Sequence, residues 1–414
     1  MRHRESRELL LRIYGAALQS VNGRTTVREY LRHRSFPGQV NLIAIGKAAV
    51  SMAWGARDAL GRKIGRALVI TKRGYGDPHL PFECLQSAHP VPDESSLEAG
   101  GRLLEFIASA PPRSPFLFLI SGGTSSLVES LPEGVDLETL RRTNDWLLGS
   151  GLEIGAMNAI RKRLSCIKGG RLARYLAGHP TLNLMISDVI DNDPAVIGSG
   201  LLARGAEEEL PPSQHLPRWL REVLQGLESS VPAASCFEGV ENKVIADCRM
   251  AMRAAAEGGR KAGLEVYLHT PLFHGDAVRL AHRFVREIRR GMTGLYIWGG
   301  ESTVVLPSSP GRGGRNQSLA LAAARHLEGD DSILFLAAGS DGTDGPTREA
   351  GALVDGGTLA RGRLHGMNAE EALRGADAGR FLEASGDLVS TGPTGTNVMD
   401  LVLGLKKRSS QPTA

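Results

Sequence analysis

The sequence predicts an α/β protein made of two α/β domains, each with a mainly parallel sheet. Short apolar segments, such as residues 41–45 and 116–120, alternate with stretches of helical composition along the whole chain. This alternation is typical of strands joined by helices that pack on a parallel sheet. The length of 414 residues is enough for two or three domains with ample cores.

In the first half of the chain, a helix is expected up to about residue 20, and buried strands end at glycine or at acidic residues. Asp93 or Ser95 is a suitable N-cap for a helix that runs to residue 107. Gly169 and Gly170 would end a later helix whose buried side carries Ile160, Leu164 and Ile167. The expected strands cover residues 41–45, 67–70, 116–120 and 182–186, and the expected helices cover 48–60, 95–107, 136–148 and 157–167.

Residues 206–235 combine acidic, proline and serine residues around one helix, which places a domain boundary near residue 235. The predicted domains are therefore 1–235 and 236–414, and the last helix is a candidate for packing back on the first domain. Expected strands in the second domain are 243–246, 264–268, 295–298, 303–306 and 333–337, and expected helices are 250–262, 276–290, 318–324 and 398–405.

Composition excludes several classes of function. The net charge is only +4, and no arginine-rich stripe with interleaved aromatic residues indicates a nucleic-acid partner. The four cysteines are far apart and form no Cys-x-x-Cys, so neither a zinc site nor a disulfide framework is indicated. No secretory signal and no membrane-spanning apolar run is present, and the expected location is the cytoplasm, without a membrane partner.

A glycine-rich loop at residues 311–317 is the most distinctive candidate for a binding site. Gly313 and Gly314 lead into Arg315 and Asn316, where a helix is expected to begin. Backbone N–H groups at a helix N-terminus favour an anion, and an arginine can bind phosphate or carboxylate with two hydrogen bonds. The alternative is a flexible glycine hairpin with solvated arginines. Glu301 is a lone carboxylate just before this loop.

Small and hydroxyl-bearing residues follow the strand at residues 116–120 at once. Ser121, Gly122, Gly123, Thr124 and Ser125 have the composition of a phosphate-binding loop, although a tight turn with an N-cap has the same composition. Lys47 follows the strand at residues 41–45 and is either a cation in the site or a surface lysine.

Acidic clusters follow two further strands. Asp188 and Asp191 are candidates for a base or for Mg²⁺ ligands, and capping is the alternative role. Asp341 and Asp344 resemble metal ligands, but the distal Glu of an EF-hand is missing. Glycine-rich or acidic loops thus follow five expected strands in the two halves of the chain, at residues 46–47, 121–126, 187–193, 299–301 and 340–345. Because ligands of α/β proteins bind beyond the carboxyl ends of the strands, this predicts a cleft between the domains.

Several well-known nucleotide motifs are absent. The chain contains no Gly-x-x-x-x-Gly-Lys-Ser/Thr and no protein-kinase signature set. The segment Gly46-Lys47-Ala48-Ala49 departs from the Gly-x-Gly-x-x-Gly of dinucleotide-binding domains. A nucleotide, if bound, is therefore held in another way.

Motifs along nearly the whole chain resemble those of glycerate 2-kinases of the MOFRL type, a family often labelled hydroxypyruvate reductase. The matching segments are residues 45–49, 87–94, 157–165, 168–173, 311–317, 341–347 and 392–397. The resemblance implies a larger Rossmann-like N-terminal α/β/α domain, a smaller C-terminal α/β domain and an active site in the interdomain cleft. One departure is the segment 198–203, where the family usually has a proline-containing sequence.

The resemblance implies an ATP- and Mg²⁺-dependent enzyme that phosphorylates D-glycerate to 2-phosphoglycerate. It also implies catalytic roles for Lys47 and Arg315, to which Asp188 and Asp191 are added as candidates. The complete set of expected binding residues is Ser121, Gly122, Gly123, Thr124, Ser125, Gly313, Gly314, Asn316 and Asn397 for nucleotide or phosphate, Arg161, Lys162 and Glu301 for substrate, and Asp341 and Asp344 for metal.

Two alternatives stay open at this stage. An NAD(P)H-dependent hydroxypyruvate reductase lacks the dinucleotide motif, although Thr71, Lys72 and Arg73 would suit a 2′-phosphate. A sugar-phosphate sensor without catalytic activity is the other. The expected partners are D-glycerate and ATP, and a homodimer is an assembly that the sequence leaves open.

Overall fold

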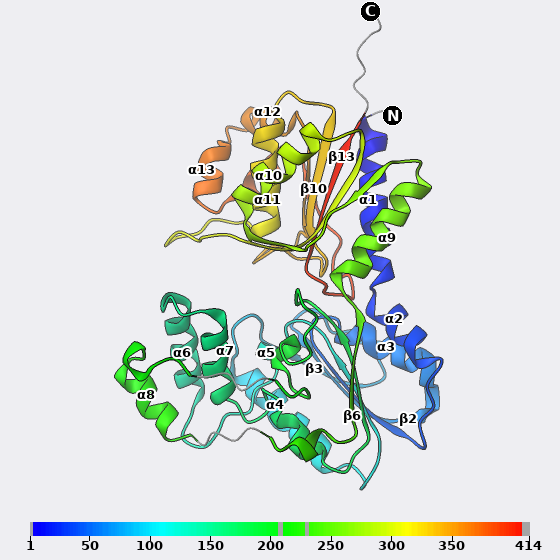
Figure 1. Ribbon diagram of the computed structural model, residues 1–414, viewed down its shortest axis with the longest axis vertical. Coiled ribbons are helices and arrows are strands. Elements are labelled where there is room, and N and C mark those ends of the chain that lie inside the picture. Colours follow the sequence, from blue (N-terminus) through cyan, green and yellow to red (C-terminus); the bar gives the residue numbers. More distant parts are fainter. Residues whose placement is uncertain (1–2, 206–209, 228–231, 408–414) are drawn as a thin grey trace, which may run out of the picture. The chain divides into compact units, whose positions relative to one another are not determined.

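The computed structural model describes residues 3–205, 210–227 and 232–407, and its chain divides into two compact units (Figure 1). The parallel-sheet unit contains residues 23–245, and the mixed-sheet unit contains residues 1–22 and 246–414. None of the helices in the described ranges is long and apolar enough to cross a membrane. Residues 206–209 and 228–231, which belong to the stretch 206–235 of the expected domain boundary, lie outside the described residues.

The parallel-sheet unit has six strands in the order β3-β2-β1-β4-β5-β6. The pairs β1–β2, β1–β4, β2–β3 and β4–β5 are all parallel. The strands are β1 Val40–Ile45, β2 Ile64–Lys72, β3 Glu83–Ser87, β4 Phe116–Ile120, β5 Thr181–Ile186 and β6 Val240–Ala246. Every residue of β1, β4 and β5 is buried, which explains why these strands are apolar except at Asn41, Thr181 and Asn183.

Helices cover both faces of this sheet. Phe106 of α4 packs with Ile43 and Phe118 on one face, and α3 contacts β1, β2 and β4. Asp93 caps α4 as expected, since its carboxylate accepts a hydrogen bond from the Ser95 N–H. The helices are α2 Gly23–Leu31, α3 Ala49–Leu60, α4 Glu94–Ala108, α5 Thr124–Leu127, α6 Leu137–Gly149, α7 Ile154–Arg163 and α8 Arg218–Gln225.

Helices α6, α7 and α8 form a smaller apolar cluster of their own, with Leu147, Ile160, Leu164 and Leu220 buried in it. The α7 helix differs from the expected 157–167, because it begins at Ile154 and ends at Arg163. Ile160, Leu164 and Ile167 are nevertheless buried, as predicted.

The prediction that the second sheet is mainly parallel is wrong, because most strand pairs of the mixed-sheet unit are antiparallel. Its order is β12-β11-β10-β13-β9-β7, with β8 also paired to β9. The β10–β11, β10–β13, β11–β12 and β13–β9 pairs are antiparallel, and only β7–β9 and β8–β9 are parallel. The strands are β7 Val266–Leu268, β8 Phe273–Asp276, β9 Gly294–Thr303, β10 Ile333–Gly339, β11 Gly351–Val354, β12 Leu388–Val389 and β13 Asp400–Lys406.

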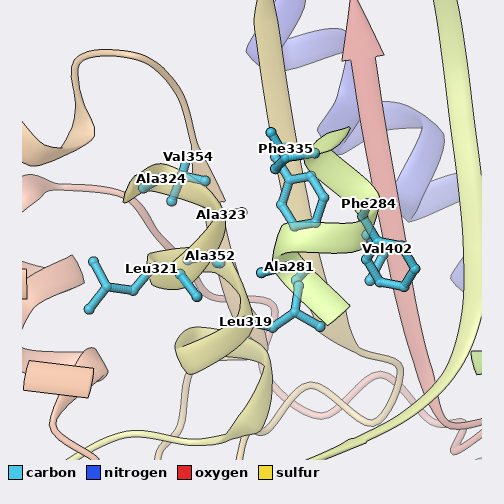
Figure 2. Close-up of a cluster of buried hydrophobic side chains, with 14 of the residues drawn as sticks. Ala281, Phe284, Leu319, Leu321, Ala323, Ala324, Phe335, Ala352, Val354 and Val402 are labelled. Carbon is cyan, nitrogen blue, oxygen red and sulfur yellow. The ribbon is translucent and has the colours of Figure 1, made fainter. Parts of the chain in front are cut away.

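Helices lie on both sides of the mixed sheet (Figure 1). Figure 2 shows side chains of α10 and α11, among them Phe284 and Leu319, packed against Phe335 and Val402 of the sheet. On the other side, α9 lies against β9, and α1 lies along α9. The helices are α1 His3–Ser20, α9 Cys248–Lys261, α10 Ala277–Arg290, α11 Arg315–Leu327, α12 Thr358–Leu364, α13 Ala369–Arg374 and α14 Ala378–Ser385.

The predicted last helix, residues 398–405, is wrong. The segment forms β13, which lies between β10 and β9 in the sheet. Leu401, Val402 and Leu403 are fully buried, so both faces of the strand are apolar. A short apolar run of this kind has no period that separates a buried strand from a buried helix.

The expected strands at 295–298 and 303–306 are also corrected, because residues 294–303 form the single strand β9. Gly299 and Gly300 therefore lie inside a strand and not in a loop. A Cβ atom on Gly299 would lie 2.4 Å from Cys248 Sγ, and one on Gly300 would lie 2.0 Å from the Phe273 carbonyl oxygen. Close packing of α9 and β8 requires these glycines.

The two units differ from the predicted domains 1–235 and 236–414 at both ends of the first domain. The helix α1 belongs with the mixed sheet, where Tyr14 donates a hydrogen bond to the Gly339 carbonyl at 2.7 Å and Arg7 binds Asp355 at 2.6 Å. The boundary falls after residue 245 because β6 completes the edge of the parallel sheet beside β5.

Candidate functional site

The strand order of the parallel sheet creates a topological switch point between β1 and β4. The chain proceeds outward from β1 to β2 and β3, and then returns to β4 on the other side of β1. Loops at the carboxyl ends of two such strands diverge, and ligands of α/β proteins bind in the space between them. Lys47 follows β1, and Ser121–Ser125 follow β4, so the structure brings these predicted site residues to one place.

Hydrogen bonds join the two loops at this switch point. The Lys47 N–H donates to the Gly122 carbonyl at 2.9 Å, and the Ala48 N–H donates to Ser121 Oγ at 3.0 Å. Thr124 Oγ1 donates to the Ile45 carbonyl at 3.1 Å. These hydrogen bonds hold the two loops together, and Lys47 is part of the joined structure.

A third loop, residues 198–200, lies against the loop after β4. Ser125 Oγ and Ser199 Oγ are 2.6 Å apart. A Cβ atom on Gly198, which has a φ of +58°, would lie 3.1 Å from Ile120 Cγ2 and Thr124 Cβ. The sequence at 198–200, where the chain departs from the resemblance, thus packs directly on the predicted phosphate loop.

Residues 165–170 hold the third loop in place through backbone hydrogen bonds. The Gly169 N–H donates to the Ser199 carbonyl at 2.9 Å, and the Gly170 N–H donates to the Gly200 carbonyl at 2.7 Å. Lys162, on the last turn of α7, lies beside Gly169, since a Cβ atom there would be 3.4 Å from Lys162 Cδ.

A buried ion pair joins this segment to Glu129, which follows α5. Lys168 Nζ lies 2.5 Å from Glu129 Oε2, and Ser165 Oγ donates to Glu129 Oε1 at 2.6 Å. The Glu129 side chain is fully buried, and that of Lys168 is 7% exposed. Burying two charges is favourable only when they are paired and hydrogen-bonded, as they are here.

The remaining predicted residues of this unit lie in different environments. Asp188 follows β5, the neighbour of β4, and is half-buried, whereas Asp191 is exposed. Arg161 donates from Nε to Asn144 Oδ1 of α6 at 3.2 Å, and burial lowers the pKa of its guanidinium. Arg161 therefore contacts α6, while Lys162 lies beside the segment that supports the loops.

In the mixed-sheet unit, Arg315 is the first residue of α11 and is paired with two carboxylates. Arg315 Nε lies 3.0 Å from Asp400 Oδ2, and Nη1 donates to Glu301 Oε1. Burial by itself lowers the pKa of Arg315, but Asp400 and Glu301 outweigh burial and raise the pKa above its usual value. The guanidinium therefore stays charged. Its ion pair with Asp400, which is only 2% exposed, fixes its position.

Asp344 occupies the N-terminus of α11, where the sequence predicted a bound phosphate. Its carboxylate accepts hydrogen bonds from the Gln317 N–H at 2.8 Å and the Asn316 N–H at 3.1 Å. A Cβ atom on Gly314 would lie 2.2 Å from the Asp344 carboxyl carbon, which explains this glycine. The anion at this helix terminus is thus a side chain of the protein itself.

Burial has a strong effect on this carboxyl group. It raises the pKa of Asp344 to about 7, against the opposing effect of the two backbone N–H groups. Burial also raises the pKa of Asp400. The charge of Asp400 adds to the effect of burial on Asp344, whereas Arg315 opposes it, because a like charge disfavours the ionised carboxyl group and an opposite charge favours it.

The other predicted residues of this unit lie in two joined segments. The Asp341 carboxylate accepts a hydrogen bond from the Thr343 N–H at 2.9 Å. Asn397 is buried and precedes Val398, whose N–H donates to Ser340 Oγ at 2.7 Å. Gly313 packs against the backbone of Gly379, since a Cβ atom there would be 3.0 Å from the Gly379 nitrogen.

The metal-ligand assignment of Asp341 and Asp344 stays a prediction. Within residues 3–205, 210–227 and 232–407, no group of three or more His, Cys, Asp or Glu side chains is arranged to hold a metal ion. The Asp344 carboxylate accepts hydrogen bonds from the backbone N–H groups at the N-terminus of α11. These residues do not form a metal cage of their own.

Comparisons with known proteins support one family. Residues 9–209 match a domain of unknown function, DUF4147, and residues 294–400 match the MOFRL family. A protein named D-glycerate 2-kinase from Thermotoga maritima is 35% identical over 411 residues, which cover 96% of this chain and 98% of that protein. The chain belongs to the MOFRL-type glycerate kinase family.

Two further relatives extend the comparison. The crystal structure of a glycerate kinase from Thermotoga maritima has a TM-score of 0.81 and 33% identity, covering 97% of this chain and 100% of that one. A protein named putative hydroxypyruvate reductase from Agrobacterium vitis is 36% identical, covering 96% of this chain and 93% of that protein. Both names that the sequence suggests therefore occur among relatives of this glycerate kinase family member.

Sequence reasoning for this MOFRL-type chain missed Glu129, Lys168 and Asp400. Lys168 was within a motif of the resemblance, but its pairing with Glu129, 39 positions away, leaves no local pattern. Asp400 was placed in a helix, so its position beside Arg315 was hidden. An acidic residue inside an otherwise apolar run was the one available signal, since a buried carboxylate requires a partner.

Proposed function

We propose that this protein is an ATP-dependent glycerate 2-kinase, which transfers the γ-phosphoryl group of ATP to the 2-hydroxyl of D-glycerate and releases ADP and 2-phosphoglycerate. The observation that carries the proposal is the full-length similarity to a protein named D-glycerate 2-kinase, at 35% identity. The switch-point loops around Lys47 and the paired guanidinium of Arg315 are the features of this chain that suit the chemistry.

Phosphoryl transfer depends on positioning and on neutralising charge more than on covalent chemistry. In this proposal, the Lys47 ammonium neutralises phosphoryl oxygens at the switch point, and Arg315 presents its planar fork to a phosphoryl or carboxylate group. Asp188 accepts a hydrogen bond from the substrate hydroxyl. The pairing of Arg315 with Glu301 and Asp400 keeps the guanidinium charged and oriented before a ligand arrives.

Magnesium enters this proposal only with the nucleotide. Mg²⁺ is usually held by substrate phosphates, water and one or two carboxylates, and not by a protein cage. Bound in this way, Mg²⁺ would shield the charge of the transferring phosphoryl group. Asp188, which follows β5, the neighbour of β4, would offer it a carboxylate oxygen.

Hydroxypyruvate reduction is the second candidate. The strand order β3-β2-β1-β4-β5-β6 is the order of dinucleotide-binding domains, and one relative carries the reductase name. The turn after β1 argues against it, because Gly46-Lys47-Ala48-Ala49 lacks the glycines that let a pyrophosphate approach the backbone.

Two assays on the same purified protein separate these functions. The first follows ADP release with ATP, Mg²⁺ and D-glycerate, and the second follows nicotinamide absorbance with NADH or NADPH and hydroxypyruvate. We expect ADP release that depends on D-glycerate and no change of nicotinamide absorbance. Oxidation of the nicotinamide without ADP release would overturn the kinase proposal, and activity in neither assay would favour a binding protein.

A further inference from the structure

His89 lies at the switch-point site although it follows an edge strand of the sheet. It comes two residues after the end of β3, and β3 is separated from β4 by β2 and β1. Its ring nevertheless lies beside Gly123, in the loop after β4. The segment after β3 therefore brings the His89 side chain to the loop after β4, although two strands lie between β3 and β4 in the sheet.

The chain on both sides of His89 is firmly held. Ser87 and Ala88 are buried, and Asp93 caps α4 through a capping box with Ser96. This fixes where the segment between β3 and α4 begins and ends. His89 itself is only half-buried, so its ring is accessible from solvent.

The imidazole of His89 and the side chain of Lys47 both lie beside the same glycine, Gly123. A Cβ atom on Gly123 would lie 3.0 Å from His89 Cδ2, 3.3 Å from His89 Nε2 and 3.2 Å from Lys47 Cγ. The ring edge that carries Nε2 thus faces Gly123. A side chain at position 123 would fill the space between the two basic residues.

We propose that His89 is a substrate-contacting residue, which donates a hydrogen bond from Nε2 to an anionic oxygen bound between its ring and the Lys47 ammonium, over Gly123. Imidazole can donate from Nε2 in its protonated form and in one neutral tautomer. Together with a lysine it suits the oxygens of a phosphoryl group or of a carboxylate. The inference rests on the proposed function for the identity of the substrates, and the geometry around Gly123 is independent of it.

The first experiment is a kinetic comparison of His89→Gln with wild type, with His33→Gln as the control. His33 is an exposed histidine of the same unit. We expect His89→Gln to lower kcat/KM by on the order of 10²-fold, as for other donors to developing charge. A rise of KM for glycerate alone would assign the oxygen to the substrate carboxylate, a rise of KM for ATP to the nucleotide, and a fall of kcat to the transferring group.

The second experiment uses Gly123→Ala and the matched control Gly134→Ala. Both glycines have left-handed backbones, with φ of +88° and +81°, but a Cβ atom on Gly134 meets nothing within 4 Å. The two alanines carry similar backbone strain, and only Gly123→Ala fills the space between His89 and Lys47. We expect similar shifts of Tm in both variants but a large loss of kcat/KM only in Gly123→Ala. In a His89→Ala background, Gly123→Ala should cost less.

Binding to the folded protein is measured separately, so that failure of the proposed function is distinguishable. Histidine ring signals in nitrogen NMR spectra are followed during titration with ATP and with D-glycerate, in wild type and in His89→Gln. A ring signal that shifts with one of these ligands and is missing in the variant supports the contact, even if wild type transfers no phosphate. The proposal is overturned if His89→Gln has kcat and KM values within twofold of wild type, or if no signal lost in His89→Gln responds to either ligand.

Discussion

The sequence predicts that Arg315 acts on a bound anion. The structure adds a second role, because Arg315 is the partner of Asp400, a carboxylate that is 2% exposed. Replacing one member of such a pair leaves the other charged group buried without compensation. Arg315 is therefore expected to contribute both to stability and to catalysis.

Arg315→Lys should lower kcat by on the order of 10²-fold, because lysine keeps the charge but lacks the planar fork. Arg315→Ala should lower it further and should also reduce the free energy of unfolding by about 1–3 kcal/mol. Steady-state kinetics and urea denaturation measure the two effects. Arg312→Ala is the control, since Arg312 lies in the same loop and pairs with Glu383 and Glu349, whose side chains are 58% and 17% exposed and thus less buried than Asp400. Wild-type kinetics in a folded Arg315→Ala would show that the glycine loop is an ordinary turn.

Lys168 and Glu129 are expected to act as a unit. Lys168→Met leaves the Glu129 carboxylate buried without its cation and should destabilise the protein by about 3–5 kcal/mol. The double variant Glu129→Leu/Lys168→Met should recover much of that loss, because no charge is then left unpaired. Urea denaturation of both variants is the measurement. Additive losses of stability would show that the two side chains do not depend on each other.

At the level of single residues, the sequence predicted which residues follow β1 and β4 better than it predicted the residues that support their loops. Lys47 and Ser121–Ser125 follow their strands directly, so the apolar runs before them were enough to place them. His89 could not be placed, because its approach to Gly123 depends on the path of the segment after β3, which no local pattern shows. The role of Asp344 at the N-terminus of α11 could not be predicted, because no local pattern indicates that its carboxylate accepts a hydrogen bond from Asn316, 28 residues away, and its assignment as a metal ligand stays a prediction.

At the level of elements, the N-terminus of α11 is stabilised by a buried carboxyl group from another segment. Asp344 has its pKa raised to about 7, against an ordinary value of 3.8. Between about pH 4 and 7 the folded protein therefore holds a proton that the unfolded chain releases. The contribution of Asp344 to stability is most favourable at low pH and falls as the pH rises through this window.

Asp344→Asn removes this titration while keeping an oxygen acceptor for the α11 N–H groups. The free energy of unfolding of the variant minus that of wild type should increase from pH 4 to pH 7, by at most about 1.4 kcal/mol per pH unit. Asp400 is present in both proteins, so its own titration largely cancels. Denaturation curves at several pH values give the difference. A difference that stays constant over this range, or that decreases, would contradict the proposed burial effect.

Whether the other elements were predicted correctly depended on whether their structure is determined by neighbouring residues in the sequence or by distant ones. Strands β1, β4 and β5 were predicted because the central strands of a parallel sheet are buried on both faces and therefore mostly apolar. The same property misled the prediction of β13, which is equally apolar but antiparallel to its neighbours. The glycines of β9 looked like a loop because the close approach of Cys248 and Phe273 is not visible in the sequence.

At the level of the whole molecule, the N-terminal helix belongs to the unit formed by the C-terminal half of the chain. Arg7 binds both Asp355 and Asp387, and Arg361 binds the same two carboxylates. Tyr14 is buried and donates to the Gly339 carbonyl at the end of β10. Chain order alone predicted the opposite grouping, because α1 precedes the first strand of the parallel sheet.

Removal of residues 1–22 should therefore destabilise the mixed-sheet unit and leave the parallel-sheet unit largely intact. Hydrogen exchange of the full chain and of the shortened chain is the measurement. Faster exchange is expected in β10, β13 and α9, which α1 contacts, and little change is expected in β1 and β4. Arg7→Ala should show the same pattern more weakly. Faster exchange confined to the parallel sheet would contradict the assignment of α1.

The central claim is that the chain phosphorylates D-glycerate at its 2-hydroxyl with ATP. Phosphorus and proton NMR of a reaction with the purified full-length protein, ATP, Mg²⁺ and D-glycerate tests it most directly, because the product and its site of phosphorylation are identified together. We predict equal amounts of ADP and 2-phosphoglycerate, and no turnover in Lys47→Met. Formation of 3-phosphoglycerate would contradict the assigned hydroxyl, and the absence of any phosphorylated glycerate with folded protein would contradict the claim itself.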